Sequence, residues 1–215
     1  MVSRLLSRYG CSVVCCFVFT VSCLLPPAAF SQAVDSAGSL KSGIAQFNSG
    51  NYEGAEVELN KAVELNPKNS QAFFYLAEVS FIQHEDKKAM ENYNRAIALD
   101  STSSKAYKGR GRVKAKLEDY YGSIDDFTKA IKLNKQFSDA YFNRALSYLF
   151  LKDYKSAIAD FSEVIKMNSK DYQAYAQRGS AKFEAGDKKG ACLDWSKAGE
   201  LGYAKIYESI KKNCK

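Results

Sequence analysis

Four cations recur at helical spacing in the middle of the chain and could bind an anion. They are Lys105, Lys108, Arg112 and Lys116, three or four residues apart, so an α-helix would hold them on one face. Residues 104–137 contain nine Lys and Arg against four Asp and Glu, a net charge of +5. Ammonium and guanidinium groups bind carboxylates through charge-assisted hydrogen bonds. Two interpretations remain open: a stripe that recognises an acidic ligand, or an ordinary solvated outer face.

Residues suited to catalysis or metal binding are scarce. The chain has one histidine, His84, which cannot form a histidine-rich metal site and weakens any histidine-dependent catalytic triad. The neighbouring acids Asp125 and Asp126 would point to different faces of a helix, and we expect them to be solvated. No glycine-rich phosphate loop follows a strand pattern. The sequence therefore predicts no catalytic residue, no metal and no cofactor.

Composition limits the class of protein further. The 215 residues are 46% hydrophobic and 26% charged, which excludes wholesale disorder. The formal charge of +7 raises the question of nucleic acid. However, the basic stripe lacks the interleaved aromatic residues on which bases stack, and the start of the chain indicates export. We therefore predict no nucleic-acid partner.

The first 33 residues differ from everything that follows. Arg4 and Arg8 precede an uncharged, mostly apolar run over 11–25, and small residues follow. This order is typical of a secretory signal peptide, with cleavage after Ser31 or Ala33. The apolar run of about 15 residues is short for a membrane-spanning helix. We therefore predict a signal peptide over 1–33 and an exported protein, periplasmic or secreted.

Two alternatives to cleavage of this segment would attach the protein to a membrane. If 1–33 were retained, it would be an N-terminal anchor. Cys23 follows small residues and could be acylated, although the apolar Leu24 and Leu25 fit a lipoprotein motif poorly. Either fate would favour a membrane-anchored cell-envelope assembly factor, so membrane contact is expected only if the segment is retained or lipidated.

A period of 34 residues organises the remainder of the chain. Units begin at Ser36, Ser70, Ser104, Ser138 and Tyr172, and equivalent positions match without an insertion. Small, large and small residues recur at spacings of four and three, as in Ala157, Phe161 and Val164. This spacing places them on one face of a helix. Each unit is therefore predicted to be two helices joined by a turn. No such hairpin buries its apolar face alone, so the units must stack.

This pattern resembles the tetratricopeptide repeat, which has the same period and the same small and aromatic positions. The resemblance covers 36–205 in five units: 36–69, 70–103, 104–137, 138–171 and 172–205. It implies an all-α, right-handed superhelical solenoid of helix-turn-helix repeats. Residues 203–215 overlap the end of the fifth unit and are predicted to form a C-terminal capping helix, because the end of a solenoid needs a polar outer face.

Two cysteines follow the predicted signal peptide. Cys192 occupies a position held by Met90, Ile124 and Ile158 in earlier units, and Cys214 lies in the predicted capping helix. A disulfide between Cys192 and Cys214 would tie the cap to the last unit. The alternative is two buried thiols that pack as small hydrophobic groups.

The resemblance also implies where a partner binds. In tetratricopeptide proteins the first helices of the repeats line a concave groove that holds an extended peptide or a partner helix. The corresponding positions here form an apolar, a cationic and a second apolar zone, in which Phe142 and Phe150 are expected to be the more exposed. The groove residues are Phe74, Phe81, Lys105, Lys108, Arg112, Lys116, Phe142, Leu146 and Phe150. The implied function is a non-catalytic scaffold for a protein or peptide, and an acidic ligand would complement the stripe.

Overall fold

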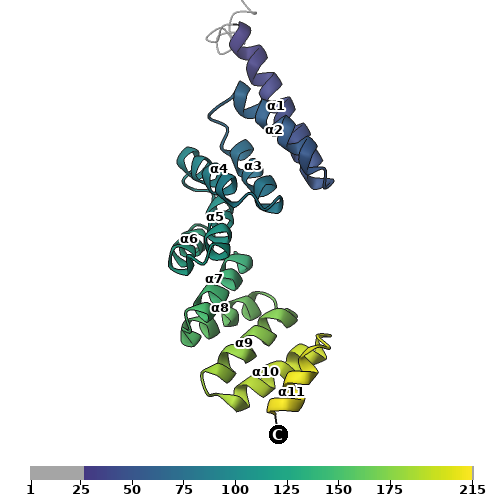
Figure 1. Cartoon of the computed structure of the whole chain (residues 1–215), viewed down its shortest axis with the longest axis vertical. Helices are drawn as coiled ribbons and strands as arrows, with labels where there is room; N and C mark the ends of the chain where they lie inside the picture. The colour runs from purple at the N-terminus through teal and green to yellow at the C-terminus, as the bar shows by residue number, and fades with distance from the viewer. Residues whose placement is uncertain (1–26, 215) are drawn as a thin grey trace, which may run out of the picture.

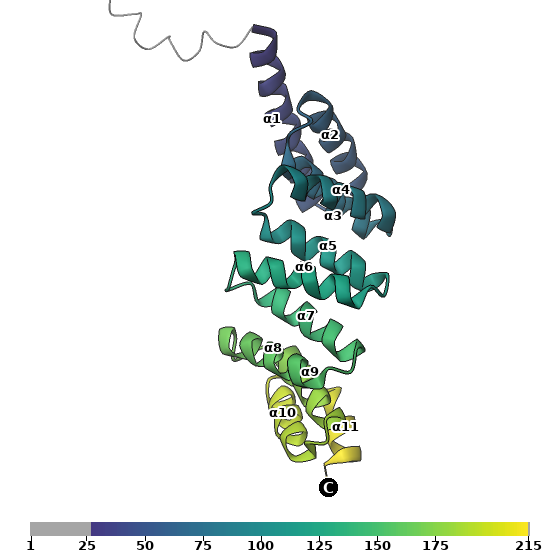
Figure 2. The same cartoon turned by 90° about the vertical axis from the view of Figure 1, so that its left-hand side faces the viewer.

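The computed structural model describes residues 27–214, which contain helices and no strand. The helices are α1 (Pro27–Asn48), α2 (Tyr52–Leu65), α3 (Ser70–Ile82), α4 (Asp86–Leu99), α5 (Ser104–Lys116), α6 (Tyr120–Leu133), α7 (Ser138–Phe150), α8 (Tyr154–Met167), α9 (Tyr172–Glu184), α10 (Lys188–Glu200) and α11 (Ile206–Asn213). Figures 1 and 2 show the pairs stacked in single file from α1 to α11. The predicted all-α, superhelical solenoid of helix pairs is confirmed.

Helix α1 begins before the first repeat unit. It has 22 residues, whereas the first helices of the later pairs have 13. The predicted signal peptide falls on 1–26, which lie outside the described residues, and on the first turns of α1. Within the described part of the chain, no helix combines the length and apolar character needed to cross a membrane. Export therefore stays a prediction.

The helix boundaries follow from local chemistry at the turns. The side chains of Asn51, Asp119, Asp153 and Asp187 each accept a hydrogen bond from the backbone N–H three residues on, which satisfies one of the free donors at the start of a second helix. The turn before each second helix contains one residue with positive φ. These residues are Gly50, His84, Glu118, Lys152 and Gly186. The single histidine is therefore an exposed turn residue.

Large residues of the second helices form the core between the two helices of each pair. Tyr93, Phe127 and Phe161 are fully buried and Trp195 is 4% exposed. The first helices present small residues to these side chains. A Cβ added at Gly111 would lie 2.8 Å from the Phe127 ring, closer than real Cβ contacts allow. The alternation of small and large residues therefore brings the two helices of a pair together.

The first helices line the inner side of the curved stack. Besides its own second helix, each of α1, α3 and α5 also contacts the first helix of the next pair. Such contacts are expected on the concave side, where neighbouring repeats converge. Figure 1 shows α4 and α6 on the opposite, outer side. The cations of α5 are thus carried by a helix of the inner wall.

The C-terminal end is closed by α11. Ile206 is buried against Ala198 and Trp195 of α10, in a cluster that also includes Ile210. A disulfide joins Cys192 of α10 to the residue after α11, Cys214, with the two Cα atoms 5.7 Å apart. The structure therefore contains the bridged form of the two cysteines rather than two thiols.

Candidate ligand-binding groove

Two of the four stripe cations are already neutralised by the second repeat. The Arg112 guanidinium lies over the Phe81 ring, 4.3 Å from its centroid, and 3.7 Å from Glu78 Oε2. Lys116 Nζ lies 2.6 Å from Asp86 Oδ1 and 5.5 Å from the same Phe81 ring. Arg112 and Lys116 therefore join α5 to the preceding repeat, and they offer a ligand much less charge than the sequence pattern implies.

The other two stripe cations form no ion pair among the described residues. Lys108 Nζ lies 5.8 Å from the centroid of the Phe137 ring, on the side of the fourth repeat. Lys105 is exposed at the start of α5. The capacity of the stripe to bind an anion therefore rests on Lys105 and Lys108.

A hollow of about 300 Å³ lies beside Lys105, between α3, the end of α4 and the start of α5. Its lining is Ser70, Gln71, Phe74, Tyr75, Ala96, Asp100, Ser103 and Lys105. Phe74 and Tyr75 provide apolar surface, and the serines and Gln71 provide hydrogen-bonding groups. The Thr102 hydroxyl and N–H donate to Asp100 Oδ1 over 2.6 and 2.9 Å, and these bonds lower the pKa of Asp100. The hollow can accept one side chain of a ligand held by Lys105.

The apolar groove residues of the second repeat are largely engaged in packing. Phe74 contacts the Tyr75 ring edge-on with centroids 5.2 Å apart and lies 6.2 Å from the Tyr93 ring. Phe81 supports Arg112 and Lys116. Only part of each ring is therefore available to a ligand.

The fourth repeat differs in part from the expectation. Phe142 packs edge-on against the buried Phe161, with centroids 5.3 Å apart, and is half-buried rather than exposed. Leu146 belongs to the same cluster. Phe150 is 66% exposed and stacks on Tyr120 with centroids 4.7 Å apart. Of this zone, Phe150 offers the most apolar surface to a partner.

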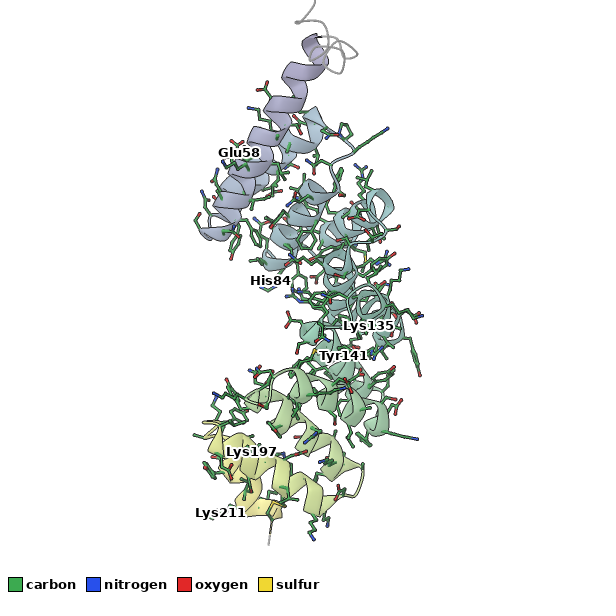
Figure 3. The ribbon with its side chains drawn as sticks, turned by 180° about the vertical axis from the view of Figure 1, so that it is seen from behind. Glu58, His84, Lys135, Tyr141, Lys197 and Lys211 are labelled. Carbon is green, nitrogen blue, oxygen red and sulfur yellow. A yellow bond between two sulfur atoms is a disulfide. The ribbon has the colours of Figure 1, made fainter. Side chains whose placement is uncertain are left out.

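His84 takes no part in a site with acid–base geometry. It lies in the turn between α3 and α4 (Figure 3), and its Nδ1 is 3.4 Å from Lys116 Nζ. Among the described residues, no group of three or more potential ligands could hold a metal ion.

Sequence reasoning missed three buried ion pairs of identical geometry. Arg110 pairs with Asp126, Arg144 with Asp160, and Arg178 with Asp194, through two guanidinium nitrogens at 2.6–2.9 Å. A third nitrogen, Nη1, donates to Asn94, Thr128 or Ser162 of the preceding repeat at 2.8–3.0 Å. We call this series the guanidinium ladder. It links each helix from α4 to α9 to the next helix, so that the series ends at α10.

The ladder overturns one expectation from the sequence. Asp126 was expected to be solvated, but it is 4% exposed and also lies 2.9 Å from Lys114 Nζ. Hydrogen bonding to Asp126 raises the pKa of Arg110. The signal that could have found the ladder is the 34-residue spacing of its arginines and of its aspartates, with 16 residues from each arginine to its aspartate.

Family models agree with the repeat architecture. Models of the tetratricopeptide repeat match residues 40–104 and 138–171. The chain is a tetratricopeptide repeat protein, and this fold supports a role as a scaffold for protein–protein interaction. A comparison with curated proteins found no match.

Several solved structures have a similar fold. MamA protein is 23% identical, with a TM-score of 0.70 over 84% of this chain and 96% of that one. PilF of Pseudomonas aeruginosa is 22% identical, with a TM-score of 0.71 over 80% of this chain and 78% of that one. YrrB, described as a TPR protein with an unusual peptide-binding site, is 17% identical, with a TM-score of 0.73 over 86% of this chain and 96% of that one. At these identities the likeness shows the fold alone.

Proposed function

We propose that this protein is a non-catalytic scaffold that holds an extended, acidic peptide segment in its concave groove. The observation that carries this proposal is the pair Lys105 and Lys108. They are the two stripe cations without an ion pair among the described residues, and Lys105 borders a hollow with apolar surface. An acidic side chain or terminal carboxylate would bind the lysines, and a neighbouring apolar side chain would enter the hollow beside Phe74.

Charged and apolar contacts in the groove contribute to different steps of binding. Charge-assisted contacts to Lys105 and Lys108 orient the ligand and speed its association, whereas buried apolar surface slows its release. The description of YrrB as a peptide-binding protein with a similar fold supports a peptide as ligand.

We further propose that the protein acts in the periplasm or outside the cell. The signal-peptide pattern of 1–33 supports export, and the Cys192–Cys214 disulfide suits an oxidising compartment. Sequencing the N-terminus of the protein purified from its native cells tests this proposal. A new N-terminus at residue 32 or 34 is expected, whereas an N-terminus at Met1 or an acylated Cys23 would instead indicate a membrane-anchored factor.

The groove is tested by reversing the charge of its two unpaired lysines. Partners captured from native cells are identified by mass spectrometry, and the bound segment is then titrated as a labelled peptide against purified protein. We expect the double variant Lys105→Glu and Lys108→Glu to bind at least about tenfold more weakly, because two attractive contacts become repulsive. Arg112 is left unchanged because its pairing with Glu78 supports the fold.

A matched control separates the groove from general charge. Lys132 and Lys135 are exposed residues of the same repeat without ion pairs among the described residues. The variant Lys132→Glu and Lys135→Glu makes the same change in net charge and should bind normally. Undiminished binding by the groove variant, or an equal loss in both variants, would contradict the proposed site.

A further inference from the structure

A second hollow lies at the C-terminal end of the molecule, away from α5 and its cations. It measures about 520 Å³ and lies between α10 and α11, the two helices at the lower end of Figure 1. Its lining consists of Lys188, Lys189, Cys192, Leu193, Ser196, Asn213 and Cys214. We call it the terminal hollow. It contains lysines and apolar groups and no acidic side chain.

The short length of α11 explains why the terminal hollow is open. In the inner repeats, a second helix packs against the 13-residue first helix of the next pair. Helix α11 ends at Asn213 after eight residues. It runs back along α10 as far as Cys192, where the disulfide holds it, and leaves the first turn of α10 uncovered. The described residues therefore leave uncovered a face that the next repeat covers elsewhere in the stack.

Two residues of α10 give this hollow its apolar and cationic character. Leu193 occupies a solvent-facing position held by Val57, Glu91, Asp125 and Ala159 in the preceding repeats, and it is 66% exposed. Lys188 stands where three repeats have a tyrosine. Leu193 therefore adds exposed apolar surface to the lining of the hollow, beside the two lysines.

The charged side chains in the lining of the terminal hollow are lysines without an ion pair among the described residues. Lys188 and Lys189 line it, and Lys211 and Lys212 are exposed on the last turn of α11. None of the four forms an ion pair among the described residues, whereas the nearby Lys182 lies 2.8 Å from Asp194, which also pairs with Arg178. The adjacent charges of Lys188 and Lys189 in the lining favour an anionic partner.

We propose that the terminal hollow is a second docking site, which binds an acidic protein segment carrying an apolar side chain. The apolar side chain would contact Leu193 and the disulfide, and acidic residues on either side of it would meet the lysines of α10 and α11. A flat lipid surface fits less well, because it would meet the lysines at the rim without filling the concave floor. The scaffold then has two separate contact faces and can bring two partners together.

The proposal is tested with a defined probe. The probe is a capped seven-residue peptide with a central leucine between two runs of three glutamates, titrated into the ¹⁵N-labelled chain. We expect amide shift changes at Leu193, Ser196 and Asn213. We also expect at least about tenfold weaker binding at these amides for Lys188→Glu with Lys189→Glu, and about threefold weaker binding for Leu193→Ser. The variant Lys132→Glu with Lys135→Glu is the control of equal charge and should bind normally.

Three results would overturn this proposal. They are shift changes confined to α5, equal affinity for a peptide with serine at its centre, or no change in the charge-reversed variant. Vesicles of phosphatidylcholine with phosphatidylglycerol form a separate arm, and binding to them in place of the peptide would make the surface a membrane site instead. The first result would still be compatible with the proposed groove, so failure at the two sites is distinguishable.

Discussion

The three C-terminal repeats and the second repeat use different chemistry at the same two positions. Repeats three to five place an arginine in the first helix and an aspartate in the second, which form the guanidinium ladder. Repeat two has the buried Leu76 and Asn92 at these positions. Its buried contacts with repeat one are apolar, in a cluster that includes Leu59, Phe73 and Leu76, and the ion pair between the two repeats, Lys88 with Glu56, is partly exposed.

The difference shows two ways to join neighbouring hairpins. Apolar contacts are tolerant of small shifts, whereas the bidentate pair of Arg144 and Asp160 fixes both distance and orientation. Nη1 of Arg144 also binds Thr128 of the preceding repeat at 2.9 Å, so each rung joins three helices. We therefore expect the C-terminal repeats to have the more rigidly defined curvature, and the junction of repeats one and two to be more adaptable.

The largest effect is expected when one rung of the ladder is broken. The variant Arg144→Ala leaves the carboxylate of Asp160 buried without its charge partner, and such a loss costs about 3–5 kcal/mol of unfolding free energy. Both side chains are well shielded, at 15% and 8% exposed. Denaturant unfolding measures the loss, and hydrogen exchange should show weakened protection in α6, α7 and α8.

Two further variants test whether the cost at Arg144 comes from the buried ion pair. Arg95 on α4 is exposed and lies 5.4 Å from the Phe73 ring, so Arg95→Ala should cost about 0.5–1 kcal/mol. The double variant Arg144→Leu with Asp160→Asn gives repeat four the residues of repeat two, and it should recover most of the loss. If Arg144→Ala cost no more unfolding free energy than Arg95→Ala, the ladder would stabilise the fold no more than an exposed cation–π contact does.

A smaller effect is expected at the junction of repeats two and three, where a glycine admits an aromatic side chain. A Cβ at Gly109 would lie 2.3 Å from Tyr93 Cε1, so Gly109→Ala forces a rearrangement and should cost about 1–3 kcal/mol. Gly38 in α1 has no atom near such a Cβ, and Gly38→Ala should stabilise by about 0.5–1 kcal/mol. Thermal unfolding compares the two, and changes of the same sign would contradict this account.

The fold could be predicted from the sequence because it depends on residues close together in each unit. The small and aromatic positions recur within each unit, and the helix pairs lie within the predicted units, as α5 and α6 do within 104–137. The charge that the stripe cations of α5 offer to a ligand depends instead on their neighbours in other repeats. The partner of Lys116 is Asp86, 30 residues away, and that of Arg112 is Glu78. Net charge within one unit could not reveal which cations are neutralised.

The smallest effect concerns pH and depends on Tyr93, whose counterparts in repeats three and four are phenylalanines. Burial raises the pKa of the Tyr93 hydroxyl, and the charge of Glu78, to which it donates a hydrogen bond, raises it further. In the unfolded chain a tyrosine titrates near pH 10. Above that pH the unfolded state loses a proton that the folded state keeps, so stability should fall by up to about 1.4 kcal/mol per pH unit. Below pH 10 the contribution is fully present.

The variant Tyr93→Phe isolates this contribution. It gives repeat two the residue of Phe127 and Phe161, and its stability should fall less steeply than that of the native chain between pH 9.5 and 11. Tyr121→Phe, at an exposed position of α6, is the control and should retain the native slope. Equal slopes for all three chains in urea unfolding would mean that the hydroxyl of Tyr93 ionises as freely in the folded protein as in water. Repeat two would then differ from repeats three and four in its hydrogen bonding but not in its response to pH.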